Sequence, residues 1–153
     1  MLLYLVRHGK SLPKEVDPDQ GLTEQGRIEV QQMAIKAREM GISVARIIHS
    51  GKKRALQTAE TLSALLTPGR KPDAHEGLNP TDDVAAFALT LSGSDDLMVV
   101  GHLPFMERLA ALLIAGSPDK PVICFRNSGI VCLKFEKERL SWVILWALVP
   151  EMA

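Results

Sequence analysis

The sequence predicts a single-domain α/β protein, a three-layer αβα sandwich around a mixed, mainly parallel sheet. Two patterns lead to this class. Short, nearly continuous apolar runs alternate with segments whose apolar residues recur at helical spacing, which is typical of strands covered by helices on both faces. After Pro121 two β-type runs are separated by a charged tetrapeptide, which indicates an antiparallel hairpin. With 153 residues, 46% of them hydrophobic, the chain can bury one core, so we expect one domain over 1–153.

The first half of the chain is expected to form two strand–helix pairs. Leu2 to Val6 fits a strand buried on both faces, and a polar, proline-containing loop follows it. Thr23 is a good N-cap for a helix that continues to Met40, and Gly41 is well placed to end it. Ala45 to His49 predicts the second strand. The helix after it covers residues 55–66, because a Pro-Gly pair then interrupts the helical spacing.

The second half is expected to add two helices and three strands. A weaker helix is predicted over 82–91, then a strand over 97–100 and a helix whose apolar face includes Met106 and Leu113. The hairpin pairs residues 130–135 with 142–149. In the last run, Trp142 and Trp146 alternate with two aliphatic residues, Ile144 and Leu148. We expect all four on one strand face, as core residues.

Composition and charge exclude several classes of protein. Eighteen basic residues balance eighteen acidic ones, so no overall field attracts nucleic acid or an anionic membrane. The apolar run Met1 to Val6 is shorter than a signal-peptide core, and no later run has the length of a membrane span. We therefore expect a cytoplasmic protein with no nucleic-acid or membrane partner. Cys124 and Cys132 lack the spacing of metal ligands and are expected to be reduced, buried, inert thiols.

Candidate functional residues follow three of the predicted strands. In open α/β sheets, ligands bind beyond the carboxyl ends of the strands, in the strand-to-helix turns. These turns are residues 7–10, 50–54 and 101–104, and each contains a histidine or an arginine. Two arginines and two histidines at one sheet edge would form a pocket for a dianionic phosphoryl group.

The residue types in this pocket suit phosphoryl transfer. An arginine donates bidentate hydrogen bonds to phosphate oxygens and stays protonated, so Arg7 and Arg54 fit as a clamp. A neutral imidazole is a nitrogen nucleophile that divides hydrolysis into two easier steps. His8, next to Arg7, is the natural candidate for this role. His102 would sit at the start of a helix, where negative charge is favoured.

Three segments of the sequence resemble the histidine phosphatase superfamily, also called phosphoglycerate-mutase-like. They are Leu5-Val6-Arg7-His8-Gly9-Lys10-Ser11, Ser50-Gly51-Lys52-Lys53-Arg54-Ala55-Leu56-Gln57-Thr58-Ala59 and Gly101-His102. The resemblance continues through Leu22-Thr23-Glu24-Gln25-Gly26 and Asn127-Ser128-Gly129-Ile130. A single Arg-His-Gly would be weak evidence, but three motifs in the family's order, each on a predicted turn, are specific.

The resemblance implies a role for each matching residue. His8 would accept the phosphoryl group and Arg7 and Arg54 would bind it, while His102 would stabilise the charge that develops on it. Further phosphate contacts are implied for Ser50 and Asn127. The family also uses an acid as proton donor to the leaving group. Glu76 lies about where this acid is expected, although Asp82 and Asp83 are rivals. Gly51 stands where the family commonly has proline. No metal or cofactor is implied.

The length of the segment between Arg54 and His102 indicates which members of the superfamily the chain resembles. Residues between Arg54 and His102 must form most of two helices and a strand, which leaves little room for a helical lid insertion. An open site suits a phosphate displayed on a macromolecule. In this respect the chain resembles SixA-type phosphohistidine phosphatases, which act on phosphohistidine in phosphotransfer domains of bacterial signalling proteins. The implied partner is therefore a phosphorylated histidine phosphotransfer domain, with inorganic phosphate as the product.

Two other functions remain open. The same site could hydrolyse a small phosphate ester, such as a sugar phosphate or a nucleotide. Alternatively, the chain could be a non-catalytic module that binds phosphoproteins, although binding alone would need only the arginines. His49 and His75 match no family position and are expected to be structural or surface residues.

Overall fold

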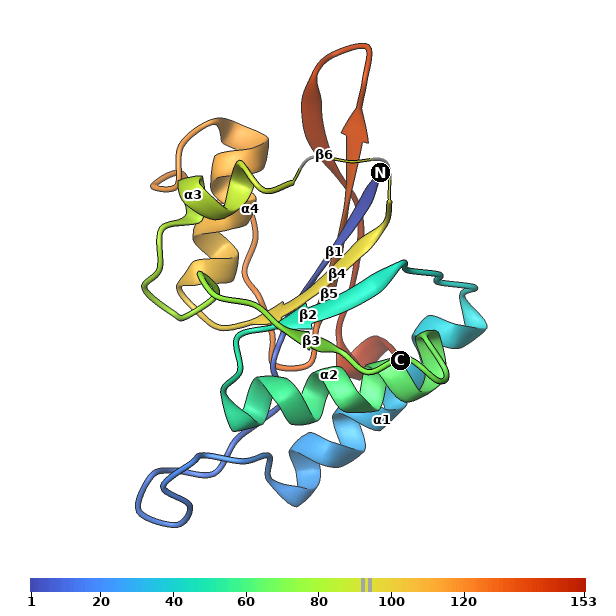
Figure 1. The fold of residues 1–153 in the computed structure, drawn as a ribbon, viewed down its shortest axis with the longest axis vertical. Coiled ribbons are helices and arrows are strands. Elements are labelled where there is room, and N and C mark those ends of the chain that lie inside the picture. The colour runs from blue at the N-terminus through green and yellow to red at the C-terminus, as the bar shows by residue number, and fades with distance from the viewer. Residues whose placement is uncertain (92, 94) are drawn as a thin grey trace.

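The computed structural model describes residues 1–153 except 92 and 94, and over these residues the chain forms one sheet with helices on both faces (Figure 1). In the described residues the sheet has six strands in the order β3-β2-β4-β1-β5-β6. The strands are β1 Leu2–Arg7, β2 Arg46–His49, β3 Asp73–Ala74, β4 Leu97–Gly101, β5 Ile130–Glu136 and β6 Ser141–Leu148. The first four are mutually parallel, whereas β5 runs antiparallel to β1 and β6 antiparallel to β5. The predicted mixed, mainly parallel sheet is confirmed.

Two hydrophobic clusters separate the helices into the two outer layers. Alternate residues of β1 face opposite sides of the sheet. Tyr4 and Val6 pack with the helices α1 (Glu24–Glu39) and α2 (Lys53–Leu66). Leu3 and Leu5 pack with α3 (Val84–Ala88) and α4 (Phe105–Ala115). The predicted three-layer αβα arrangement is therefore confirmed, and a short 3-10 helix, η1 (Pro150–Met152), follows β6.

The predicted helix over 82–91 is shorter than expected, and one strand was missed. The carboxylate of Asp83 accepts a hydrogen bond from the Ala85 amide at 2.8 Å and caps α3, so the helix begins only after it. Its other end lies at the surface, where the side chain of Leu89 is 85% exposed and gains nothing from a longer helix. The missed strand, β3, has two residues, which is too short for a periodic signal.

The two tryptophans lie on opposite faces of the sheet, so the expectation that they share one face is wrong. The register between β5 and β6 shifts between Cys132 and Leu133. Trp142 packs against Phe135, with ring centroids 5.4 Å apart, and Trp146 against Tyr4 at 6.0 Å. A β-bulge inserts one extra residue into a strand and reverses the phase of the side chains beyond it. Both tryptophans are partly buried and pack against different clusters, whereas Ile144 is 38% exposed, so of the four expected core residues Leu148 is the one that is buried.

Where the structure describes the chain, no helix is both long and apolar enough to cross a membrane.

Candidate active site

The three predicted turns meet at one edge of the sheet. β2, β4 and β1 are neighbours and run parallel, so the turns that follow them come together. The rings of His8 and His102 have centroids 5.0 Å apart. Arg54 Nε lies 3.3 Å from His8 Nε2, and Ser50 Oγ lies 2.5 Å from His102 Nε2. The structure therefore brings together the residues that the sequence placed in one phosphoryl pocket.

His8 is held as a neutral imidazole with one nitrogen facing Arg54. Its Nδ1 is 2.7 Å from the carbonyl oxygen of Gly9, which only accepts hydrogen bonds, so Nδ1 carries the proton and Nε2 carries the lone pair. The pKa of His8 is lowered to about 4, mainly by burial and also by the positive charges of Arg54 and Arg7, although the hydrogen bond to Gly9 O acts in the opposite direction. The ring is thus neutral at pH 7. A neutral ring whose Nε2 is unprotonated has the electronic form required of a nitrogen nucleophile.

His102 is the more deeply buried of the two histidines, with 1% of its surface exposed. Burial lowers its pKa to about 3, with further contributions from the charges of His8, Arg54 and Lys52. It is therefore also neutral at pH 7. A bound phosphate dianion next to the ring would raise this pKa, because an opposite charge favours the imidazolium.

Arg7 is anchored by its main chain and by one end of its guanidinium. Its Nη1 donates to the carbonyl oxygen of Phe125 at 3.0 Å, and the carbonyl oxygen of Arg7 accepts from the Ser128 amide at 3.0 Å. Its Nε is buried, and among the described residues it has no acceptor. Buried N–H groups without a partner are rare in folded proteins. An anion in the pocket would supply the missing acceptor.

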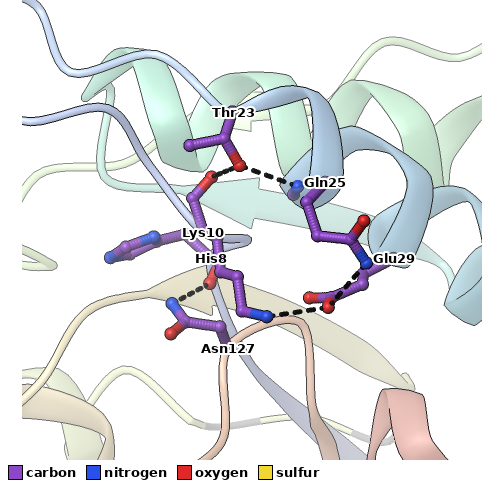
Figure 2. A network of polar contacts seen from close by, with 7 residues as sticks. His8, Lys10, Thr23, Gln25, Glu29 and Asn127 are labelled. Atoms are coloured by element: carbon purple, nitrogen blue, oxygen red, sulfur yellow. Dashed lines mark hydrogen bonds and ion pairs between the residues drawn. The ribbon is translucent and has the colours of Figure 1, made fainter. Parts of the chain in front are cut away.

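Asn127 holds the main chain of His8. Its Nδ2 donates to the carbonyl oxygen of His8 at 3.0 Å, as Figure 2 shows. On the other side of this loop, Thr23 Oγ1 accepts from the Gly26 amide and caps α1, and the Thr23 amide donates to Lys10 O at 2.9 Å. The His8 ring points away from this network (Figure 2). The observed contact of Asn127 is thus with protein, and its direct contact with phosphate stays a prediction.

Thr58 is a residue of the site that the sequence reasoning did not single out. It lies in α2, is fully buried, and its Oγ1 accepts from the Gly9 amide at 3.0 Å. The same hydroxyl donates to the carbonyl oxygen of Arg54 at 2.8 Å. One side chain therefore joins the loop that carries His8 to the helical turn that carries Arg54. The signal available in the sequence was its place in the second motif, one helical turn after Arg54.

Glu76 and its two rivals differ in what their carboxylates do. Glu76 is exposed and lines a cavity of about 600 Å³ together with Asn79 and Ser50, and the Oγ of Ser50 contacts His102, so this cavity reaches the edge of the phosphoryl pocket. Asp83 caps α3, and Asp82 accepts from the Asn79 amide at 2.8 Å. The rivals are thus engaged in local structure. Proton donation by Glu76 stays a prediction.

The remaining titratable groups have simpler surroundings. His49 Nδ1 accepts from the Gly51 amide at 3.0 Å, which stabilises the turn after β2 and fits the structural role expected for it. The ring of His75 packs edge-on against Phe87 at 5.7 Å. Cys132 is buried as expected, but Cys124 is exposed, so the expectation that both thiols are buried is wrong for Cys124. Within the described part of the chain, no three His, Cys, Asp or Glu side chains gather as metal ligands would.

Two arginines and two neutral histidines lie at the carboxyl edge of the parallel strands, an arrangement that suits phosphoryl transfer. The family model of the histidine phosphatase superfamily (branch 1) matches residues 3–82, which include Arg7, His8 and Arg54. The chain belongs to the histidine phosphatase superfamily.

Individual proteins of similar sequence or structure match almost the whole chain. The phosphohistidine phosphatase SixA of Escherichia coli is 30% identical over 156 residues, which cover 98% of this chain and 94% of that one. A structure of the protein histidine phosphatase SixA complexed with tungstate has a TM-score of 0.83 and 27% identity, covering 98% of this chain and 97% of the other. A phosphoserine phosphatase mutant of Entamoeba histolytica in complex with phosphoserine has a TM-score of 0.74 at 16% identity and covers 99% and 98% of the two chains. This last likeness concerns the fold alone.

Proposed function

We propose that this chain is a cytoplasmic, metal-independent phosphatase that removes the phosphoryl group from phosphohistidine in a protein, through a phosphorylated His8. The observation that carries the proposal is the state of His8, whose Nδ1 is bonded to Gly9 O while Nε2 keeps its lone pair beside Arg54. The 30% identity with a phosphohistidine phosphatase supports the choice of substrate. A histidine phosphotransfer domain of a bacterial signalling pathway is the partner we propose.

The reaction proceeds in two transfers. His8 Nε2 attacks phosphorus, the bond between phosphorus and the substrate imidazole breaks, and the leaving nitrogen takes a proton from Glu76. Arg54 Nε, which donates to His8 Nε2 in the empty site, donates instead to a phosphoryl oxygen. Water then attacks the phosphorus on His8, with Glu76 as the base, and inorganic phosphate leaves. Arg7, Arg54 and His102 stabilise the charge on the equatorial oxygens in both steps.

Two features favour a protein substrate over a small one. Between α2 and β4 the described residues form only the two-residue β3 and the five-residue α3, so the segment that covers the site in enclosed relatives is short here. An imidazole is also readily expelled once it is protonated, so an exposed acid such as Glu76 suffices. Small phosphate esters are the second candidate, because a phosphoserine phosphatase shares the fold.

The test is phosphate release, in the presence of EDTA, from a histidine-phosphorylated phosphotransfer domain and from a panel of sugar phosphates and nucleotides. His8→Ala is the matched inactive variant, and its melting temperature shows whether the fold is kept. We expect the wild type to prefer the phosphoprotein, and an alkaline quench to trap phosphate on the wild type but not on His8→Ala. If only small esters are turned over, the substrate is a small phosphate ester and not a phosphoprotein. Turnover by His8→Ala would refute the covalent mechanism. No turnover at all would favour a phosphate-binding module.

A further inference from the structure

A second cavity, of about 650 Å³, is lined by Arg54 and is separate from the cavity that Glu76 lines. The loop that follows β1 contributes Lys14 to its wall, and the turn before α2 contributes Lys52 and Lys53. The loop and the start of α2 lie side by side in Figure 1. We propose that this basic cavity binds a carboxylate-rich segment of the phosphorylated protein, next to its phosphohistidine. This inference rests on the proposed function and extends it to the recognition of the partner.

The cavity carries a local excess of positive charge. Lys14, Lys52, Lys53 and Arg54 line it, against Asp19 as the acidic residue of the wall. Lys53 is neutralised by Asp17 at 2.9 Å, whereas Lys14 and Lys52 form no ion pair with any described residue. The chain as a whole has equal numbers of acidic and basic residues, so this excess is a property of the cavity.

The start of α2 adds to this positive potential. The helix has 14 residues, its first turn contains no acidic residue, and its N-cap Lys52 makes no side-chain cap hydrogen bond. Cations at a helix N-terminus are unfavourable, because the helix dipole is positive there. Arg54 accounts for one of these charges through the phosphoryl group. Lys52 is exposed, and a second anion would be required to offset its unfavourable interaction with the helix dipole.

The cavity is electrostatically continuous with the phosphoryl pocket. Arg54 belongs to both, since it lines the cavity and contacts His8. The charge of Lys52 also acts on His102, where it is one of the causes of the lowered pKa. A carboxylate bound at Lys52 would therefore lie beside a phosphate bound at Arg54.

Lysines suit a protein partner better than a second phosphate clamp. Lys14 and Lys52 are exposed and end in mobile point charges, whereas a tightly bound phosphate is usually held by a planar arginine fork. Exposed charges of one sign speed the encounter with an oppositely charged surface and orient it. The fitting partner has aspartates or glutamates flanking the phosphohistidine on the side that meets this cavity.

The experiment uses two labelled peptides that contain a hydrolysis-resistant phosphonate analogue of phosphohistidine, flanked in one by glutamates and in the other by glutamines. Binding is measured at low and high salt for the wild type, for the double variant Lys14→Glu/Lys52→Glu, and for the control Lys71→Glu/Lys137→Glu. All four lysines are exposed, so the variants should fold. We expect the wild type and the control to bind the glutamate peptide about tenfold more tightly at low salt, with a smaller preference at high salt. The Lys14→Glu/Lys52→Glu variant should lose this preference.

Equal binding of the two peptides by the wild type, or a preference that survives Lys14→Glu/Lys52→Glu, would overturn the inference. Binding of pyrophosphate to the same variants tests whether the cavity is a site for a small polyanion. If Lys14→Glu/Lys52→Glu loses pyrophosphate binding but keeps the glutamate preference, the inference is also overturned. Hydrolysis of the corresponding phosphohistidine peptides is measured in parallel. A glutamate preference without hydrolysis would refute the proposed function while supporting the acidic-segment site, and hydrolysis without a preference would do the reverse.

Discussion

Replacing Thr58 with valine should disconnect the loop of the nucleophile from α2 with almost no change in side-chain volume. The hydroxyl of Thr58 accepts from the Gly9 amide and donates to the carbonyl oxygen of Arg54, at 3.0 and 2.8 Å. Valine removes both hydrogen bonds and leaves the Gly9 N–H buried without a partner. The carbonyl of Gly9 holds the proton-bearing nitrogen of His8, so a looser Gly9 peptide also loosens the imidazole.

The size of the effect follows from these contacts. An unsatisfied buried donor costs about 1–3 kcal/mol, and valine leaves no cavity that would add to it. For a chain of this length, about 2 kcal/mol corresponds to a fall in melting temperature of roughly 4–8 °C. We expect kcat to fall about tenfold, which corresponds to about 1.4 kcal/mol of lost transition-state stabilisation. KM should change less, because Arg7 and Arg54 still bind the phosphoryl group.

The assay compares kcat, KM and melting temperature for the wild type, Thr58→Val and Thr58→Ser. Serine keeps the hydroxyl but loses a buried methyl group, which costs about 1 kcal/mol. We expect melting temperature and kcat to respond differently in the two variants. Thr58→Ser should also be destabilised but should keep most of its kcat. Two variants with equally reduced kcat would indicate that packing alone matters, and a Thr58→Val protein with wild-type kcat would refute the positioning role.

The remaining predictions concern the clamp, the proton donor and the pH dependence. Arg54→Ala should cost about 2–4 kcal/mol in kcat/KM, whereas the exposed Arg38→Ala should cost nothing, and similar kinetics for the two variants would remove Arg54 from the clamp. Glu76→Gln should slow the hydrolysis of alkyl phosphates more than that of phosphohistidine, and a more damaging Asp83→Asn would show that the donor is assigned wrongly. Because burial lowers the pKa of His8 to about 4, the unfolded chain, with a histidine pKa of about 6.5, binds the proton first as the pH falls. The free energy of unfolding should therefore decrease from pH 6.5 to pH 4, by up to about 3 kcal/mol for this ring. Inorganic phosphate should reduce this loss. Denaturant titrations that show no decrease would contradict the burial of a neutral ring.

Much of the fold could be predicted because its signals are local. Leu2 to Val6 and Leu97 to Val100 are nearly continuous apolar runs, and Thr23 and Gly41 mark the two ends of α1. Strand order was less accessible, but parallel strands have their carboxyl ends on one edge whatever their order. For this reason the turns with His8, Arg54 and His102 could be placed together before their distances were known.

Features that depend on contacts between distant segments could not be predicted in this way. The phase of Trp142 and Trp146 depends on a bulge against β5, and strict alternation along β6 does not contain it. Asp82 and Asp83 looked like possible acids, and only their hydrogen bonds to main-chain amides show that they form a turn and a cap. A carboxylate has the same sequence letter in either role.

The sequence by itself determined the chemistry of this protein, since residue types in three short motifs specify two arginines and two histidines at one sheet edge. Tertiary structure decided the states of these groups. The neutral form of His8, its tautomer, and the hydroxyl of Thr58 that joins its loop to Arg54 arise from burial and from hydrogen bonds between segments far apart in the chain. The physical reason is that desolvation and hydrogen bonding act over a few ångströms in space, and only the packed fold determines which atoms are that close.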